Sequence, residues 1–320
     1  MKISFSTLCM LIVLNVFMGI AYAQAENQAG AGIRIVSSIK PLALLIQEIS
    51  DDNDEVIVLL ESQQDYDSTQ LKPSQLQTIA QAEVIFYIDD GFEKFVTSAK
   101  KDDIAQFKYI QMSETPNLRL LGLRQSGELP QVAHNSLRFS QAYLSKNRNN
   151  IDWHIWLNPD NAIVMLRKIR DELSKIRPEK QHIYQERYEI FSRHLIHYSS
   201  EKAEMMMTVL DSPFFVLQDG LQYFEEQFGL QSKGIILQHG QKTPSTKHIS
   251  KLQKLRNNYD VNIVIKEEQF SEQVITDIAG NKQFKVISVD SLAQGSFSQY
   301  EDYISYTDAI TERIFSGLRK

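Results

Sequence analysis

Cysteine is almost absent from this sequence of 320 residues, which contains only Cys9. Cys9 lies in an apolar run at the start of the chain, so the sequence after residue 23 has no cysteine. This absence excludes a disulfide framework, a thiol nucleophile and a metal site built on thiolates. After residue 23 there is also no apolar run long enough to cross a bilayer.

The sequence also lacks the short motifs of common enzymes. It contains no H-E-x-x-H, no G-x-S-x-G, no G-x-G-x-x-G after a strand and no Walker lysine. Lysine and arginine together number 34 against 40 aspartates and glutamates, and the basic residues are scattered along the chain. We therefore expect a protein that is not an enzyme, has no organic cofactor and does not bind nucleic acid.

Residues 1–23 have the pattern of a secretory signal peptide. Lys2 is followed by an uncharged apolar run and then by the tripeptide AYA at 21–23, which fits a signal peptidase site. A retained membrane anchor is the alternative, but no positively charged stop-transfer cluster follows. Cleavage after residue 23 removes one of the 34 basic residues and none of the 40 acidic ones, which leaves a net charge of about −7. We predict an exported protein.

Short β-branched runs alternate with helical patterns along the rest of the chain. The strand-like runs lie at 33–38, 55–60, 83–88, 107–111, 214–217, 234–237, 261–265 and 284–289. Between them, apolar residues recur three or four positions apart, as at Leu42, Leu45, Ile46 and Ile49, which predicts amphipathic helices. Alternation of strands and helices is typical of parallel α/β sheets.

A long helical region divides this pattern into two halves. Apolar residues recur from Pro159 until Pro178, and a second helical stretch runs from about 179 to about 210. We predict an α/β fold of two lobes, each with a parallel sheet flanked by helices, joined by a long rigid helix, with a ligand cleft between the lobes. The predicted boundaries are 24–158 for the N-terminal lobe, 159–178 for the connecting helix and 179–320 for the C-terminal lobe.

Polar side chains follow the strand-like runs of the second half. They include Gln218, Asp219, Gln238, His239, Lys266, Glu267, Glu268 and Asp290. In open parallel sheets, ligands bind outside the carboxyl ends of the strands. Carboxylate, amide and imidazole groups there suit a divalent cation, although polar residues also collect at strand ends that simply face solvent.

Six segments, in the same order along about 260 residues, give the chain a family resemblance. They are IVSSIKPLALLIQEI (35–49), VLL (58–60) with KPS (72–74), SETPNLRLLGLR (113–124), HIWLNPDNA (154–162), YFEEQFGL (223–230) and VDSLAQG (289–295). With these segments the chain resembles the zinc-type, ZnuA-like periplasmic solute-binding proteins of ABC importers. The resemblance implies a monomer of two lobes bridged by a rigid helix, which captures a divalent ion between the lobes and delivers it to an ABC permease in the inner membrane.

The family binds its ion through three histidines and, in some members, an acid. His154 matches the histidine of the family's H-[IL]-W-L motif, and Asp290 matches its acidic position. Two family histidines are replaced here, one by Gln218 and the other by Asp67, or by Gln64 in a gapped alignment. The resemblance thus implies that His154, Asp290, Asp67 and Gln218 converge on one ion.

An oxygen-rich site of this kind differs from the family's imidazole site. Zinc favours nitrogen and sulfur ligands, whereas carboxylate and amide oxygens shift the preference toward manganese or magnesium-like ions. We expect zinc as the transported ion by resemblance, with manganese as the alternative, and a weaker site than is usual in the family. His239, together with Glu267 or Glu268, is a conceivable replacement for the missing ligands.

The two tryptophans of the chain flank His154. If residues 153–156 are extended, Trp153 and Ile155 face one way while His154 and Trp156 face the other, so one indole packs in the core and the other borders the histidine. A histidine in an apolar setting is often a structural residue. Loss of two imidazoles therefore leaves a second hypothesis, a metal-free paralogue that binds another small ligand or a protein partner.

Overall fold

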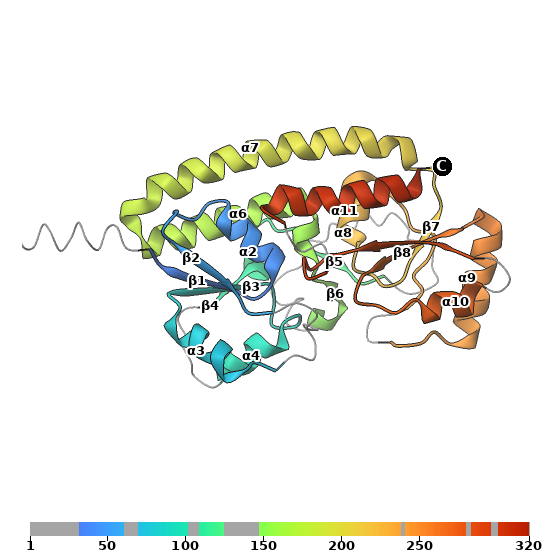
Figure 1. The fold of residues 1–320 in the computed structure, drawn as a ribbon, viewed down its shortest axis with the longest axis horizontal. Coiled ribbons are helices and arrows are strands. Elements are labelled where there is room, and N and C mark those ends of the chain that lie inside the picture. Colours follow the sequence, from blue (N-terminus) through green and yellow to red (C-terminus); the bar gives the residue numbers. More distant parts are fainter. Residues whose placement is uncertain are drawn as a thin grey trace, which may run out of the picture.

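Two parallel sheets lie side by side, and long helices run along one side of both (Figure 1). The structure, a computed structural model, describes residues 32–60, 70–101, 109–124, 147–237, 241–279, 283–295 and 300–319. We call the first sheet with its helices the first lobe, and the second sheet with its helices the second lobe. This arrangement confirms the predicted two-lobed α/β fold.

The sheet of the first lobe has four parallel strands in the order β2-β1-β3-β4. These strands are β1 (Arg34–Ser37), β2 (Glu55–Val58), β3 (Val84–Tyr87) and β4 (Tyr109–Gln111). The helices between them are α2 (Lys40–Gln47), α3 (Pro73–Gln81) and α4 (Lys94–Lys101). Ile35 at the centre of β1 is fully buried and pairs with Val56 on one side and Val84 on the other. Strands buried on both faces explain the continuous apolar runs in the sequence.

The sheet of the second lobe has three parallel strands in the order β7-β8-β9. Its strands are β7 (Phe214–Val216), β8 (Ile263–Glu267) and β9 (Lys285–Val289), and its helices are α8 (Gln222–Phe228), α9 (Thr246–Tyr259), α10 (Gln273–Ala279) and α11 (Tyr303–Leu318). The predicted strand at 234–237 forms only an isolated parallel bridge, between Val216 and Ile235. The run is apolar because it is buried beside β7, not because it is a full strand.

Two long helices follow each other in the middle of the chain, α6 (Pro159–Ile176) and α7 (Gln181–Met206). Near its start, α7 contacts the first lobe through an ion pair of Arg187 with Asp52 at 2.6 Å. Near its end, Lys202 pairs with Glu312 of α11 at 2.7 Å, and α11 packs on β9. The helix that runs past both lobes is therefore α7 (Figure 1). The segment 159–178, predicted to be the connecting helix, is α6 and packs against α2 in the first lobe.

A short antiparallel ribbon positions the segment that contains both tryptophans. It consists of β5 (Leu121–Gly122) and β6 (Ile151–Asp152), and a short 3-10 helix (Ile155–Leu157) and α6 follow it. Asn158 caps α6, because its side chain accepts a hydrogen bond from the backbone N–H of Asn161 at 3.1 Å. Within the described ranges, no helix is long and apolar enough to span a membrane.

Candidate functional site

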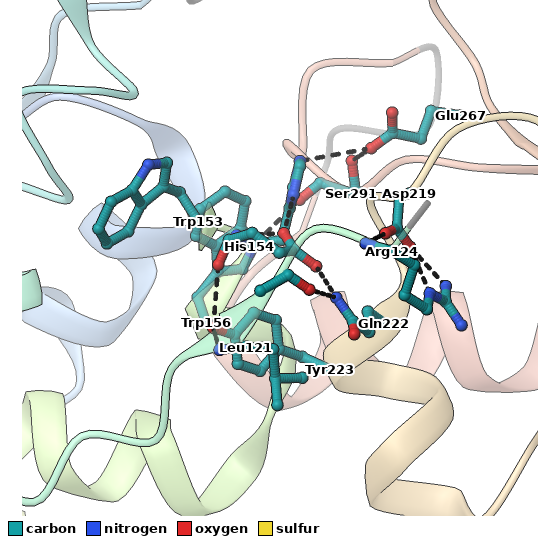
Figure 2. Close-up of polar contacts among 12 residues, drawn as sticks. Leu121, Arg124, Trp153, His154, Trp156, Asp219, Gln222, Tyr223, Glu267 and Ser291 are labelled. Atoms are coloured by element: carbon teal, nitrogen blue, oxygen red, sulfur yellow. Dashed lines mark hydrogen bonds and ion pairs between the residues drawn. The ribbon is translucent and has the colours of Figure 1, made fainter. Parts of the chain in front are cut away.

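A small pocket of about 30 Å³ lies where the two lobes meet. The ribbon of the first lobe contributes Asp152 and His154 to its wall. The second lobe contributes Gln218, Asp219 and Gly220 after β7, and Glu267 at the end of β8. Figure 2 shows how the side chains of His154, Asp219 and Glu267 lie relative to one another. The pocket therefore lies at the carboxyl ends of two parallel strands, where open α/β sheets bind ligands.

Asp152 fixes the orientation of the His154 ring. Its Oδ1 atom accepts a hydrogen bond from the backbone N–H of His154 at 3.0 Å and lies 2.7 Å from Nδ1 of the ring (Figure 2). A hydrogen on Nδ1 that points to a carboxylate leaves the ring's lone pair on Nε2 in the neutral form. Nε2 faces Glu267 Oε1 at 3.8 Å. A carboxylate behind a histidine is the arrangement that orients histidine ligands in metal sites.

The charges around His154 control its protonation. Burial alone would lower the pKa of the imidazole, but the carboxylate of Asp152, with smaller contributions from Glu267 and Asp219, raises that pKa above its usual value. A divalent cation would have to displace a proton held by this cluster, so binding and proton release are coupled at this position.

Both tryptophans are buried, and one of them contacts the histidine ring. The ring centroid of Trp156 lies 5.2 Å from that of His154, and Phe92 approaches the same ring at 5.7 Å. The prediction that an indole borders His154 is confirmed, although the extended backbone assumed for it is not formed, because residues 155–157 are a 3-10 helix. That turn lets Trp156 reach across to the second lobe, where its Nε1 donates to the carbonyl of Ser291 at 3.0 Å.

The Glu267 carboxylate is held in place on the opposite side of the pocket. Ser291 donates a hydrogen bond from its hydroxyl to Glu267 Oε1. The carbonyl of the same serine accepts from Trp156 and from the Tyr306 hydroxyl. Glu267 is thus linked through Ser291 to Trp156, the residue whose ring contacts His154.

Asp219 also lines the pocket, but Arg124 occupies its oxygens. The guanidinium of Arg124 donates to Asp219 Oδ1 at 2.7 and 2.5 Å, and the Arg124 backbone N–H donates to Oδ2 at 2.7 Å. Arg124 also pairs with the buried carboxylate of Glu225 at 2.7 Å. Burial raises the pKa of Asp219 to about 6 against the opposing effect of Arg124. The ion pair with Arg124 thus favours the charged form of the Asp219 carboxylate, while burial opposes it.

The structure brings together only some of the residues predicted to form the metal site. His154 and Gln218 line the same pocket. Asp290 lines a different hollow with Glu268, Tyr300 and Arg313, and its two oxygens accept the backbone N–H groups of Gln294 and Gly295 at 2.9 and 2.8 Å. Three other positions considered above lie outside the described residues: Asp67, Gln64 and His239. Within the described part of the chain, no three histidines or carboxylates are grouped as a metal site.

Two of the residues that shape the site, Asp152 and Arg124, were not among the predicted site residues. Asp152 shapes the site through its contact with the His154 ring. Arg124 shapes it through its ion pair with Asp219 of the second lobe. In the sequence, Glu267 is identifiable mainly as a polar residue at the end of a predicted strand. An arginine and partners about 100 residues away produce no recognisable pattern in the sequence. Such contacts become visible only in the three-dimensional fold.

Comparison with known proteins places this site in a family. A family model described as "ZnuA: Zinc-uptake complex component A periplasmic" matches residues 35–317. The chain belongs to this family. The resemblance that the six sequence segments suggested is thereby confirmed.

Similar proteins share most of the chain's length. The high-affinity zinc uptake system protein ZnuA of Haemophilus ducreyi is 23% identical over 286 residues, which cover 88% of this chain and 92% of that protein. The zinc-binding protein AdcA of Streptococcus pyogenes is 21% identical over 302 residues, 93% of this chain and 58% of AdcA. A crystal structure of ZnuA superposes with a TM-score of 0.73 at 23% identity and covers 90% of this chain and 100% of that one. The periplasmic zinc binding protein TroA of Treponema pallidum reaches 0.72 at 14% identity over 91% of this chain and 100% of TroA. Both superpositions show a shared fold.

Proposed function

We propose that this protein is the periplasmic solute-binding component of an ABC importer for a divalent metal ion, with zinc as its cargo. The observation that carries the proposal is the His154 ring, which Asp152 orients and which faces a small pocket between the lobes. A neutral imidazole nitrogen held in this way is a good zinc ligand. Family membership and the zinc-uptake names of the relatives support zinc over manganese.

The remaining steps of transport follow from this assignment. The leader at 1–23 directs export, and the mature chain of two lobes acts as a monomer. It takes up the ion at the pocket, and a permease in the inner membrane receives it. His154 and Gln218, which line the pocket, are proposed ligands, and Asp67 and Asp290 remain proposed ligands from the family alignment.

A metal-free paralogue is the second candidate, and two observations favour it. Gln218 offers a neutral amide where the family has an imidazole, and the Asp290 oxygens already accept two backbone N–H groups. In that case the pocket accommodates a different small ligand, and zinc produces no saturable binding.

Calorimetric titration decides between the two candidates. The mature protein, stripped of metal, is titrated with zinc and then with manganese, and the titrations are repeated on His154→Ala and on His194→Ala. His194 is exposed on α7, so its variant controls for zinc bound by any surface histidine. One-to-one binding that is lost in His154→Ala and kept in His194→Ala supports the transport function. Absence of heat and of any thermal shift with both ions refutes it.

A further inference from the structure

We propose that Glu267 supplies a ligand to the transported ion and so replaces one of the missing family histidines. This inference rests on the proposed function, because it names the partner that His154 uses to hold the ion. The two groups come from different lobes, His154 from the segment after β6 and Glu267 from the end of β8. An ion shared by them would therefore link the lobes.

The separation of the two groups is close to what a shared ion requires. His154 Nε2 and Glu267 Oε1 are 3.8 Å apart. Two donors that each lie about 2.0–2.1 Å from one tetrahedral zinc ion are about 3.3 Å apart. A shift of a few tenths of an ångström by the Glu267 side chain brings both atoms into bonding range, without movement of either strand.

Other carboxylates at the pocket are already engaged. Asp219 is held by Arg124 through both oxygens, and Asp152 Oδ1 is held by the His154 ring and backbone. Asp290 lines the other hollow. Among the described residues, Glu267 is the carboxylate that faces Nε2 of His154.

Glu267 also has the support that a metal ligand needs. Its side chain is 93% buried, and the Ser291 hydroxyl donates to the same Oε1 atom that faces His154. A carboxylate oxygen has two lone-pair directions, so it can accept this hydrogen bond and bind an ion at once. Ser291 thus acts as a positioning residue for Glu267.

Gly220 provides the space that this arrangement requires. A Cβ atom at position 220 would lie 3.0 Å from Glu267 Oε1 and 3.3 Å from Cε1 of His154. The backbone of the second lobe therefore closes directly over the gap between the two ligands. A side chain at this position would push the carboxylate away from the histidine, so glycine is required here for room.

Zinc titration of Glu267→Gln tests the inference. The amide keeps an oxygen that can accept the Ser291 hydrogen bond but removes the negative charge, so we expect the zinc dissociation constant to rise at least about tenfold, by analogy with the loss of a charge-assisted contact. The control is Glu55→Gln, which changes a carboxylate that pairs with Arg34 on the surface of the first lobe. We expect the control to stay within about twofold of the wild type, because surface ion pairs contribute little.

A second variant keeps the test decisive if Glu267→Gln folds poorly. Gly220→Ala leaves both ligands intact and should also weaken zinc binding, while circular dichroism without metal checks that each variant is folded. A zinc-bound crystal structure of the wild type should place an oxygen of Glu267 within about 2.2 Å of the ion.

The outcomes separate this inference from the proposed function. If the wild type binds zinc and Glu267→Gln binds it as tightly as Glu55→Gln does, Glu267 is not a ligand and the transport function still stands. If the wild type binds neither zinc nor manganese, the proposed function fails and the inference fails with it.

Discussion

Arg124 and Asp219 join the two lobes through a buried ion pair in which two guanidinium nitrogens contact one carboxylate oxygen at 2.7 and 2.5 Å. Arg124 follows β5, and Asp219 lies between β7 and α8. The same interface contains a hydrogen bond from Gln222 to the carbonyl of Gly122 and one from the Leu121 backbone to the Tyr223 hydroxyl (Figure 2). The lobes therefore meet through a specific polar interface beside the pocket.

Replacement of Arg124 should be among the most destabilising changes in this interface. Arg124→Met leaves the carboxylates of Asp219 and Glu225 buried without their cation, so we expect the free energy of unfolding to fall by about 3–5 kcal/mol. Urea denaturation measures this change. Lys175→Met is the control, because Lys175 pairs with Glu172 at the surface and should cost less than about 1 kcal/mol. Equal losses in the two variants would show that the buried link does not stabilise the fold.

Glu93 should make stability depend on pH. Its carboxyl group is fully buried and accepts a hydrogen bond from Ser38 at 2.5 Å, and burial raises its pKa to about 8. A pKa that is raised on folding contributes stability that is present below the unfolded-state pKa and is lost as pH rises through the folded-state pKa. Between about pH 4.5 and 8, the free energy of unfolding should fall by up to about 1.4 kcal/mol per pH unit relative to Glu93→Gln. Parallel pH profiles for the two proteins, from chemical denaturation, would contradict this assignment.

Gly317 allows α11 to pack closely on β9. A Cβ atom there would lie 2.1 Å from Cδ1 and 2.5 Å from Cγ1 of Ile287. Gly317→Ala should therefore lower the free energy of unfolding by about 1–3 kcal/mol through overpacking. At Gly122 the nearest atom to an added Cβ is the Asn150 carbonyl oxygen at 3.6 Å, so Gly122→Ala should be tolerated. A thermal unfolding comparison that ranks the two variants in the opposite order would refute the packing argument.

Trp156 should influence ion binding although it is not a proposed ligand. Its Nε1 donates to the Ser291 carbonyl, and the Ser291 hydroxyl donates to Glu267. Trp156→Phe removes the first of these hydrogen bonds, which should cost about 1–3 kcal/mol of stability and weaken zinc binding by a shift of Ser291. Trp153→Phe is the matched control, since Trp153 is also buried but its Nε1 donates to the Arg148 carbonyl and not to Ser291. Calorimetry on both variants gives the comparison, and equal zinc affinity in the two would exclude this indirect effect.

The sequence predicted the elements that repeat and missed those that depend on contacts between distant segments. Runs such as 83–88 became β3 because several consecutive β-branched and aromatic residues favour a buried strand. The run at 234–237 is also apolar, yet it forms one bridge to Val216, because an apolar run shows that a segment is buried but not how many bridges it forms with a neighbouring strand. The sequence also did not show that α7, and not α6, runs along both lobes. Both segments are predicted as helices, and only their packing partners differ.

For the site, the family resemblance identified His154 and Gln218 as neighbours of one pocket. Asp152 has its role because it lies at the end of a ribbon with two residues on each strand. Arg124 has its role because Asp219 approaches it from the second lobe. A ribbon of two residues on each strand is too short to produce an alternating pattern, so the sequence could not predict it.

The continuous helix α7 has a mechanical consequence for the exchange of cargo. It has 26 residues and is therefore about 39 Å long. Long helices curve gently, and a sharp bend needs a proline or a comparable break, which α7 does not contain. Helix α7, which runs along both lobes, is thus a rigid element and not a hinge. We therefore expect the ion to be released through small displacements of the loops that line the pocket, with α7 unchanged.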